Sequence, residues 1–213
     1  MLDKNVPLCF LIMYKTDTAE YPRYELPEGY TFSMYKQGDE EDWAKLEVSV
    51  GQFDTVEKGV DSFRHEFMEN QNLPLEQRIL FVRDPAGKAV ATGALWNGEY
   101  LGKEEQRLHW IATDESCKGK GIAKAIVTRL LDLYNALGFK DFIYLITESW
   151  CYSAVNIYQK FGFKAYVGKN PVTEFDMTDE EFEKQNELGL RLVSEKIKCY
   201  RGENSKEVCR KGI

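Results

Sequence analysis

A glycine-rich turn holds the residues best suited to binding a phosphate group. It lies between an expected strand and an expected helix, and it reads Lys118-Gly119-Lys120-Gly121-Ile122-Ala123. Backbone amides at a helix N-terminus can donate to an anion, and glycine leaves the approach to them open. Spacing excludes two common phosphate loops. The nucleoside-triphosphate loop requires Ser or Thr where Gly121 stands, and the dinucleotide fingerprint requires a small residue where Lys124 stands.

A second patterned segment follows, in a helix expected over residues 152–161. It reads Ser153-Ala154-Val155-Asn156-Ile157-Tyr158-Gln159-Lys160-Phe161-Gly162-Phe163. This segment resembles the signature Ala-x-x-Leu-Tyr-x-Lys-x-Gly-Phe of the Gcn5-related N-acetyltransferase (GNAT) family. The resemblance extends over residues 30–166 in the order of the elements and is carried by motifs over residues 107–163.

The glycine turn is similar to the pyrophosphate turn of the same family. In one register, Gly121 and Ala123 occupy the small positions, and Lys118 stands where Gln or Arg is usual. A second register, with Ser116 first and Gly119 and Gly121 as the small residues, fits almost as well, so both registers remain open. The chain also departs from the family pattern. Cys151 stands where an Asn is common, and Asn156 is expected to take over its polar contact with the cofactor.

The resemblance implies that acetyl-CoA is the co-substrate. Pantetheine would pair with the backbone of one strand, over residues 111–113, and the pyrophosphate would bind the turn and the start of the next helix. The residues expected to contact the cofactor are Ile111, Ala112, Thr113, Lys118, Gly119, Lys120, Gly121, Ile122, Ala123, Lys124, Asn156 and Tyr158.

Two proton transfers must accompany acyl transfer to an amine. Tyr158 matches the family tyrosine that serves as general acid. His109 is the first candidate for the base, because imidazole titrates near neutrality and alternate residues of its strand would face the substrate. Glu105 and Glu148 are the alternative bases. We expect no metal, and no thiol nucleophile is expected, because no Cys-His-acid pattern accompanies the cysteines.

The elements that would position these residues alternate between strands and helices. Strands are expected at residues 8–14 (an edge or extra strand), 30–36, 78–83, 89–96, 107–113 and 141–147. Helices are expected after Asp39 and after Thr55, and over residues 122–137 and 152–161. This order predicts an α/β fold with a mixed sheet. The resemblance implies the GNAT acyl-CoA N-acyltransferase fold, with a splayed central sheet and helices on both faces.

We expect residues 1–176 to form the N-acetyltransferase domain. Residues 177–213 would be a C-terminal helical extension, opened by a capping box between Thr178 and Glu181, for packing or oligomerisation. The last dozen residues are expected to be frayed. A homodimer is left open by the sequence.

Composition limits the partners and the setting. The net charge of -7 argues against a nucleic-acid surface, which requires clustered Lys and Arg. The apolar run Leu8–Tyr14 is too short to span a membrane. The 5 cysteines are scattered, which predicts neither a disulfide framework nor a zinc site and favours a reducing, cytoplasmic setting.

The predicted function is direct transfer of an acetyl group from acetyl-CoA to a primary amine of a small molecule or peptide. Transfer of a longer acyl group is an alternative. So is an acyl-CoA-binding regulatory module without turnover. The acceptor is not encoded in a motif, because acceptor specificity in this fold depends on the first helices and on surface loops.

Overall fold

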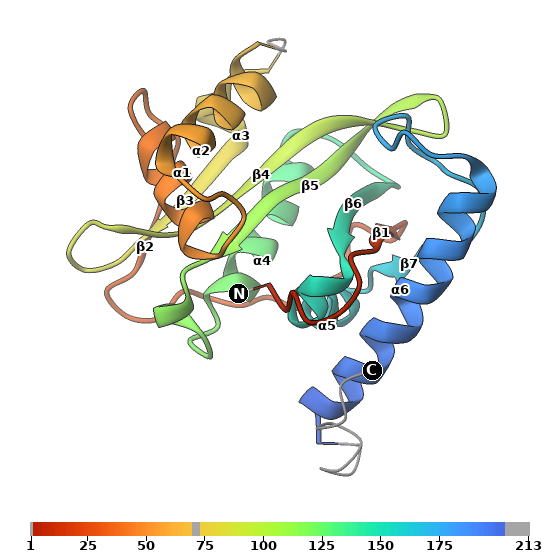
Figure 1. Ribbon diagram of the computed structural model, residues 1–213. Helices are drawn as coiled ribbons and strands as arrows, with labels where there is room; N and C mark the ends of the chain where they lie inside the picture. Colours follow the sequence, from red (N-terminus) through yellow and green to blue (C-terminus); the bar gives the residue numbers. More distant parts are fainter. Residues whose placement is uncertain (1, 70–72, 203–213) are drawn as a thin grey trace. The chain divides into compact units, whose positions relative to one another are not determined.

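A computed structural model describes residues 2–69 and 73–202, and Figure 1 shows its elements. The strands are β1 (Phe10–Lys15), β2 (Thr31–Met34), β3 (Ile79–Arg83), β4 (Ala89–Tyr100), β5 (Lys103–Thr113), β6 (Ile143–Glu148) and β7 (Lys164–Ala165). The longer helices are α1 (Glu40–Ser49), α2 (Val56–Phe63), α4 (Ile122–Ala136), α5 (Tyr152–Lys160) and α6 (Asp179–Tyr200). The short helical segments are η1 (Arg64–Met68), α3 (Leu75–Arg78), η2 (Glu115–Cys117) and η3 (Ser149–Cys151).

The described strands form a seven-stranded sheet in the order β2-β3-β4-β5-β6-β1-β7. Four pairs are antiparallel: β2 with β3, β3 with β4, and β1 with both β6 and β7. β5 and β6 are neighbours joined through helix α4, and parallel neighbours need such a crossover. The predicted α/β fold with a mixed sheet is therefore confirmed.

The chain divides into two compact units, which we describe separately. Unit 1 contains residues 22–96 and 108–139, and unit 2 contains residues 2–21, 97–107 and those from 140 onward. Strands β4 and β5 pass from one unit to the other. This division differs from a split at residue 176, and a separate C-terminal extension remains a prediction.

Helices cover both faces of the sheet in unit 1. Ile79 and Phe81 of β3 belong to an aromatic core with residues of α1, α2 and η1. On β4, a Cβ built on Gly93 would lie 3.0 Å from side-chain atoms of Ile126 and Leu130, so this residue faces α4. The next residue, Ala94, lies in the aromatic core. Because successive strand residues point to opposite faces, α4 covers the face opposite α1 and α2.

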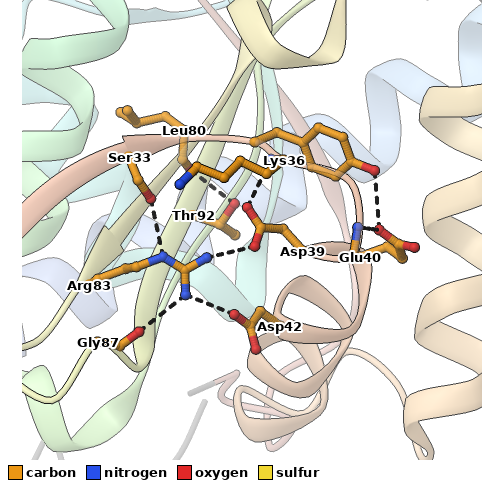
Figure 2. Close-up of polar contacts among 11 residues, drawn as sticks. Ser33, Lys36, Asp39, Glu40, Asp42, Leu80, Arg83, Gly87 and Thr92 are labelled. Carbon is orange, nitrogen blue, oxygen red and sulfur yellow. Dashed lines mark hydrogen bonds and ion pairs between the residues drawn. The ribbon is translucent and has the colours of Figure 1, made fainter.

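An ion-pair network ties β3 to the start of α1 (Figure 2). The guanidinium of Arg83 donates to Asp39 at 2.7 Å, to Asp42 at 2.8 Å and to the hydroxyl of Ser33 at 3.2 Å. Asp39 stands at the N-cap of α1, as predicted, but its side chain caps no amide of that helix. Its other carboxylate oxygen accepts from the backbone N–H of Lys36 instead. The expected cap is replaced by this network.

Two other expectations for the strands need correction. Residues 97–106 lie outside the predicted strands 89–96 and 107–113, but β4 and β5 continue through them to a tight turn at Leu101 and Gly102. Both turn residues have positive φ, 50° and 74°, as the commonest two-residue hairpin turn requires. Strand β1 is an extra strand as expected, but it is not an edge, since it pairs with β6 and with β7.

Helix α6 packs closely on β1 within unit 2. A Cβ built on Gly189 would lie 2.7 Å from the Cβ of Cys9, so glycine permits the close approach. The side-chain amide of Gln185 pairs with the backbone of Phe10, accepting its N–H at 2.9 Å and donating to its carbonyl at 3.3 Å. The predicted capping box of Thr178 and Glu181 is present. Helix α6 is therefore integrated into unit 2.

The expectation that the cysteines are unpaired holds for three of the cysteines in the described residues and fails for one. Cys9, Cys117 and Cys151 are free, as expected. Cys199, near the end of α6, is disulfide-bonded, which corrects the expectation that it is reduced. The fraying expected at the chain end falls on residues 203–213, which lie outside the described residues. No helix in the described part of the chain is long and apolar enough to cross a membrane.

A carboxyl group is buried in α1. Glu47 is only 3% exposed, and its Oε1 has no hydrogen-bond partner among the described residues. Burial without compensation disfavours the charged form, and it raises the pKa of Glu47 from 4.5 to about 8. Between these two values, the folded chain keeps a proton that the unfolded chain has released. The free energy of unfolding therefore falls as the pH rises from 4.5 to about 8.

We expect Glu47→Gln to remove this pH dependence. The variant should match the wild type near pH 4 and become more stable by on the order of 1 kcal/mol for each pH unit above it. Urea unfolding at several pH values measures the difference. Glu41→Gln, an exposed carboxyl on the same helix, is the control and should change little. A constant difference between wild type and Glu47→Gln at all pH values would contradict the prediction.

Candidate functional site

A group of backbone amides at the start of α4 lacks acceptors in the described chain. The N–H groups of Gly119, Gly121, Ile122 and Ala123 donate no hydrogen bond there. Gly119 and Gly121 have φ of +81° and +83°, and no heavy atom lies within 4 Å of a Cβ built on either. The first turn of α4 carries no acidic residue. The uncovered amides therefore fit a phosphate-bearing ligand.

The approach to this turn is fixed by Asp114. Its carboxylate accepts from the backbone N–H of Ser116 at 2.9 Å and from the Ser116 hydroxyl at 2.6 Å. The Ser116 hydrogen bonds lower the pKa of Asp114 below its ordinary value. In the second register of the predicted motif, Ser116 is the first residue. Its side chain and amide are both committed to shaping the turn.

The lysines of the turn place positive charge beside the amides. The ammonium of Lys120 donates to the hydroxyl of Tyr30 at 3.0 Å, and that of Lys124 lies 4.8 Å from the centre of the Tyr24 ring. Lys118 is exposed. These contacts hold two ammonium groups near the start of α4, where they add to the field of the helix N-terminus.

Strand β5 leads into the turn and contains the residues expected to bind pantetheine. Ala112 is buried, and Ile111 packs toward α4 beside Gly93. The hydroxyl oxygen of Thr113 is buried and has no hydrogen-bond partner among the described residues. Buried hydroxyls normally have a partner, so Thr113 offers a polar contact to a ligand. The turn amides and this hydroxyl are the polar groups that the described residues leave open here.

Strand β5 is irregular at Trp110, which has φ of +46°. Its ring lies 5.1 Å from that of Trp43 in α1, and the preceding residue, His109, contacts Glu66 and Phe67 in η1. A regular strand would send these two successive side chains to opposite faces. The left-handed residue instead leaves both on the face covered by α1, α2 and η1. This conformation costs on the order of 1–3 kcal/mol and is typical of functional sites.

His109 forms a close pair with Glu66. The distance from His109 Nε2 to Glu66 Oε1 is 2.7 Å, and the two side chains are 16% and 28% exposed. No motif in the sequence marks Glu66, which is not among the predicted site residues. Only the fold brings the π-helical segment η1 against β5.

Unit 2 contains the remaining predicted site residues. Tyr158 of α5 is 7% exposed, and burial, followed by the charge of Cys151, raises the pKa of its phenol. Burial also raises the pKa of Glu148, whose Oε2 has no hydrogen-bond partner in the described chain. Burial, then the charge of Glu148, raises the pKa of Cys151 to about 12. Burial therefore shifts these three groups toward their protonated forms.

The other two predicted residues are placed differently. Asn156 is 4% exposed, and its Oδ1 accepts from Nε of Arg201 at 3.0 Å and from another nitrogen of the same guanidinium. Its carbonyl oxygen thus contacts the end of α6, and its contact with a cofactor remains a prediction. Glu105 lies on β5 in unit 2, whereas His109 lies further along the strand in unit 1.

The predicted residues thus form two groups, each within one unit. Unit 1 holds His109, the β5 backbone over 111–113 and the turn over 118–124, and unit 2 holds Glu105, Glu148, Asn156 and Tyr158. The described residues contain no group of three or more His, Cys, Asp or Glu that could hold a metal ion. Chemically, unit 1 offers an anion site and an imidazole, and unit 2 offers buried acids.

Known proteins show the same arrangement of elements. A GCN5-related N-acetyltransferase from Sphaerobacter thermophilus matches with a TM-score of 0.55 and 19% identity, over 75% of this chain and 49% of that one. A GNAT-family acetyltransferase from Colwellia psychrerythraea matches with a TM-score of 0.55 and 17% identity, over 75% and 54%. The chain therefore spans about half the length of these structures. At identities of 19% and 17%, the similarity to these structures shows a shared fold and no more.

The sequence comparison identifies the family directly. A comparison with curated proteins gives no match. The model of the acetyltransferase (GNAT) family matches residues 43–163, which is more than half of the chain. The match includes both segments singled out in the sequence, the glycine turn and the helix of Tyr158. The chain therefore belongs to the GNAT acetyltransferase family.

Proposed function

We propose that this protein transfers the acetyl group of acetyl-CoA directly to a primary amine of a small molecule or peptide. Membership of the GNAT family supports acyl transfer from acetyl-CoA in general. The observation that carries the proposal is the set of uncovered amides at Gly119, Gly121, Ile122 and Ala123. A donor array of this kind at a helix N-terminus matches the diphosphate of coenzyme A.

The residues of β5 and the glycine turn would hold the cofactor. The backbone of residues 111–113 and the hydroxyl of Thr113 would contact pantetheine, and the amides and lysines over residues 118–124 would contact the phosphates. When bound, acetyl-CoA supplies an acetyl thioester whose carbonyl carbon an amine can attack. Asn156 and Tyr158 remain proposed contacts of the cofactor.

Two side chains are proposed to manage protons. His109 would remove a proton from the ammonium form of the acceptor, because only the neutral amine has an electron pair for attack. Tyr158 would hold the proton that the sulfur needs when it leaves, and its raised pKa keeps it protonated near neutrality. Glu105 and Glu148 are the alternative bases. Burial raises the pKa of Glu148 above its ordinary value.

Two other functions give different results in solution. Transfer of a longer acyl group would show as faster turnover with the longer acyl-CoA. A binding module would bind acyl-CoA and release no thiol with any amine. Measuring thiol release with purified protein, acetyl-CoA and a panel of amines tests the proposed function. Binding without turnover across the panel would contradict it.

We expect Gly121→Asp to abolish binding of coenzyme A. The new side chain would stand over the uncovered amides, and its charge would repel phosphate. Calorimetric titration with coenzyme A measures the loss. Gly138→Asp is the matched control, since Gly138 follows the C-terminus of the same helix with φ of +85° and nothing within 4 Å. Equal affinity in the Gly121 variant and the control would contradict the assigned turn.

Tyr158→Phe should lower kcat by roughly 10²-fold to 10⁴-fold while sparing cofactor affinity, because the phenol is the proposed general acid. Steady-state kinetics and a coenzyme A titration separate the two effects. Tyr152→Phe removes a hydroxyl from the first turn of the same helix and should leave kcat unchanged. If Tyr158→Phe retains full turnover, the phenol has no part in the transfer.

Direct transfer also predicts that no acetyl-cysteine forms. The raised pKa of Cys151, about 12, keeps its thiol protonated and weakly nucleophilic at neutral pH. After incubation with acetyl-CoA without an amine, mass spectrometry should find Cys117 and Cys151 unacetylated. Cys151→Ala should keep turnover within severalfold. An acetylated cysteine whose removal abolishes turnover would instead indicate a covalent intermediate.

A further inference from the structure

We propose that Glu66 is a positioning residue for His109. Its carboxylate holds a proton on Nε2, so that Nδ1 is the nitrogen that receives the proton of the acceptor ammonium. In this step an ammonium N–H bond breaks, the proton moves to Nδ1, and the electron pair stays on the amine nitrogen. The catalytic part of the inference rests on the proposed function, whereas the assignment of the ring nitrogens does not.

The assignment follows from the contact between the two side chains. Oε1 of Glu66 lies 2.7 Å from Nε2 of His109, a normal hydrogen-bond length. An ionised carboxylate can only accept, so Nε2 must donate. A neutral imidazole has one donor nitrogen and one acceptor nitrogen, which leaves Nδ1 as the proton acceptor.

The ring of His109 is held in place by packing as well. It meets the ring of Phe67 edge-on at 6.0 Å and the ring of Trp110 at 5.7 Å. Trp110 is the residue with φ of +46° that leaves two successive side chains of β5 on one face. The strand irregularity, the two aromatic rings and the carboxylate together fix both the position and the orientation of the imidazole.

The carboxylate reaches this position from a π-helical segment. The backbone N–H of Glu69 donates to the carbonyl of Arg64 at 3.0 Å, five residues earlier. Such a turn contains an additional residue compared with an α-helix and is frequent at functional sites. It follows directly on α2, whose last residue, Phe63, is buried in the aromatic core. Glu66 is thus presented to β5 by a local departure from α-helical geometry.

The same turn supplies an internal control. His65 and Glu69 form a second His–Glu pair at 2.8 Å, but through Nδ1, and their side chains are 79% and 65% exposed. The chain contains 2 histidines in all. A spectrum of ring nitrogens therefore contains one signal set for the proposed site and one for a surface pair of the same chemistry, where little coupling is expected.

The first test uses nitrogen NMR of the uniformly labelled full chain above the pH at which the imidazoles titrate. His65→Asn assigns the signals by removing one set. In the wild type, His109 should carry its proton on Nε2. Glu66→Leu should produce a mixture of tautomers, and Glu66→Gln should restore the Nε2–H form, because the amide oxygen still accepts. Glu69→Leu should change only the His65 signals.

The second test measures turnover with an accepted amine. Glu66→Leu should lower kcat about tenfold or more, a part of the roughly 10²-fold to 10⁴-fold that acid–base catalysis contributes, with little change in KM. Glu66→Gln should recover much of this loss. Glu69→Leu should match the wild type.

Three outcomes would overturn the inference. The first is a wild-type His109 that carries its proton on Nδ1, and the second is an unchanged His109 spectrum in Glu66→Leu. The third is an unchanged kcat in Glu66→Leu despite the altered spectrum, which would remove Glu66 from the reaction. Absence of turnover in the wild type would contradict the proposed function, and the NMR spectra would still decide the tautomer.

Discussion

The physical constraint that organises unit 1 is a group of backbone amides at the start of helix α4 that have no acceptors in the described chain. A helix leaves its first N–H groups unpaired, and proteins usually cover them with a capping side chain. Here the N-cap is Gly121 in a left-handed conformation, and no side chain caps the helix. The donors are left for an external anion. Lysines and an absence of acidic residues in the first turn strengthen the same preference.

Strand β5 leads into the turn, so its residues are next to any ligand whose phosphate binds there. The strand runs into the turn through Thr113, whose buried hydroxyl has no hydrogen-bond partner among the described residues. Further back on the strand, the left-handed Trp110 leaves His109 and Trp110 on one face. The same strand thus carries the residues suited to a cofactor and those suited to an amine. The strain at Trp110 is offset by the aromatic packing of α1, α2 and η1.

Unit 2 contributes side chains whose pKa values are raised by burial, whereas unit 1 contributes mainly open backbone donors. Desolvation raises the pKa values of Tyr158, Glu148 and Cys151, so that Tyr158 and Cys151 keep their protons near neutrality. For Tyr158 this state suits a proton donor, and for Cys151 it opposes a nucleophilic role. Helix α6 belongs to the same unit and binds Asn156 through Arg201, so it contacts a residue of the signature helix.

The sequence by itself determined the order of the main elements and the family. Strand and helix periodicity, the glycines at positive φ and the capping box of α6 are local properties, encoded in a few neighbouring residues. Predictions from local sequence were wrong where a residue far along the chain supplies the contact. Arg83 takes the carboxylate of Asp39 away from its helix, and β7 pairs with β1 and removes its free edge.

Only the tertiary structure brought Glu66 to His109. The two residues are 43 positions apart, and the contact depends on a π-helical turn and a left-handed residue, neither of which a periodic pattern reveals. The pKa shifts of Glu47, Glu148 and Tyr158 were equally hidden, because burial depends on what packs around a group from remote parts of the chain. The sequence specified which groups are present, and the fold decided their neighbours and their protonation.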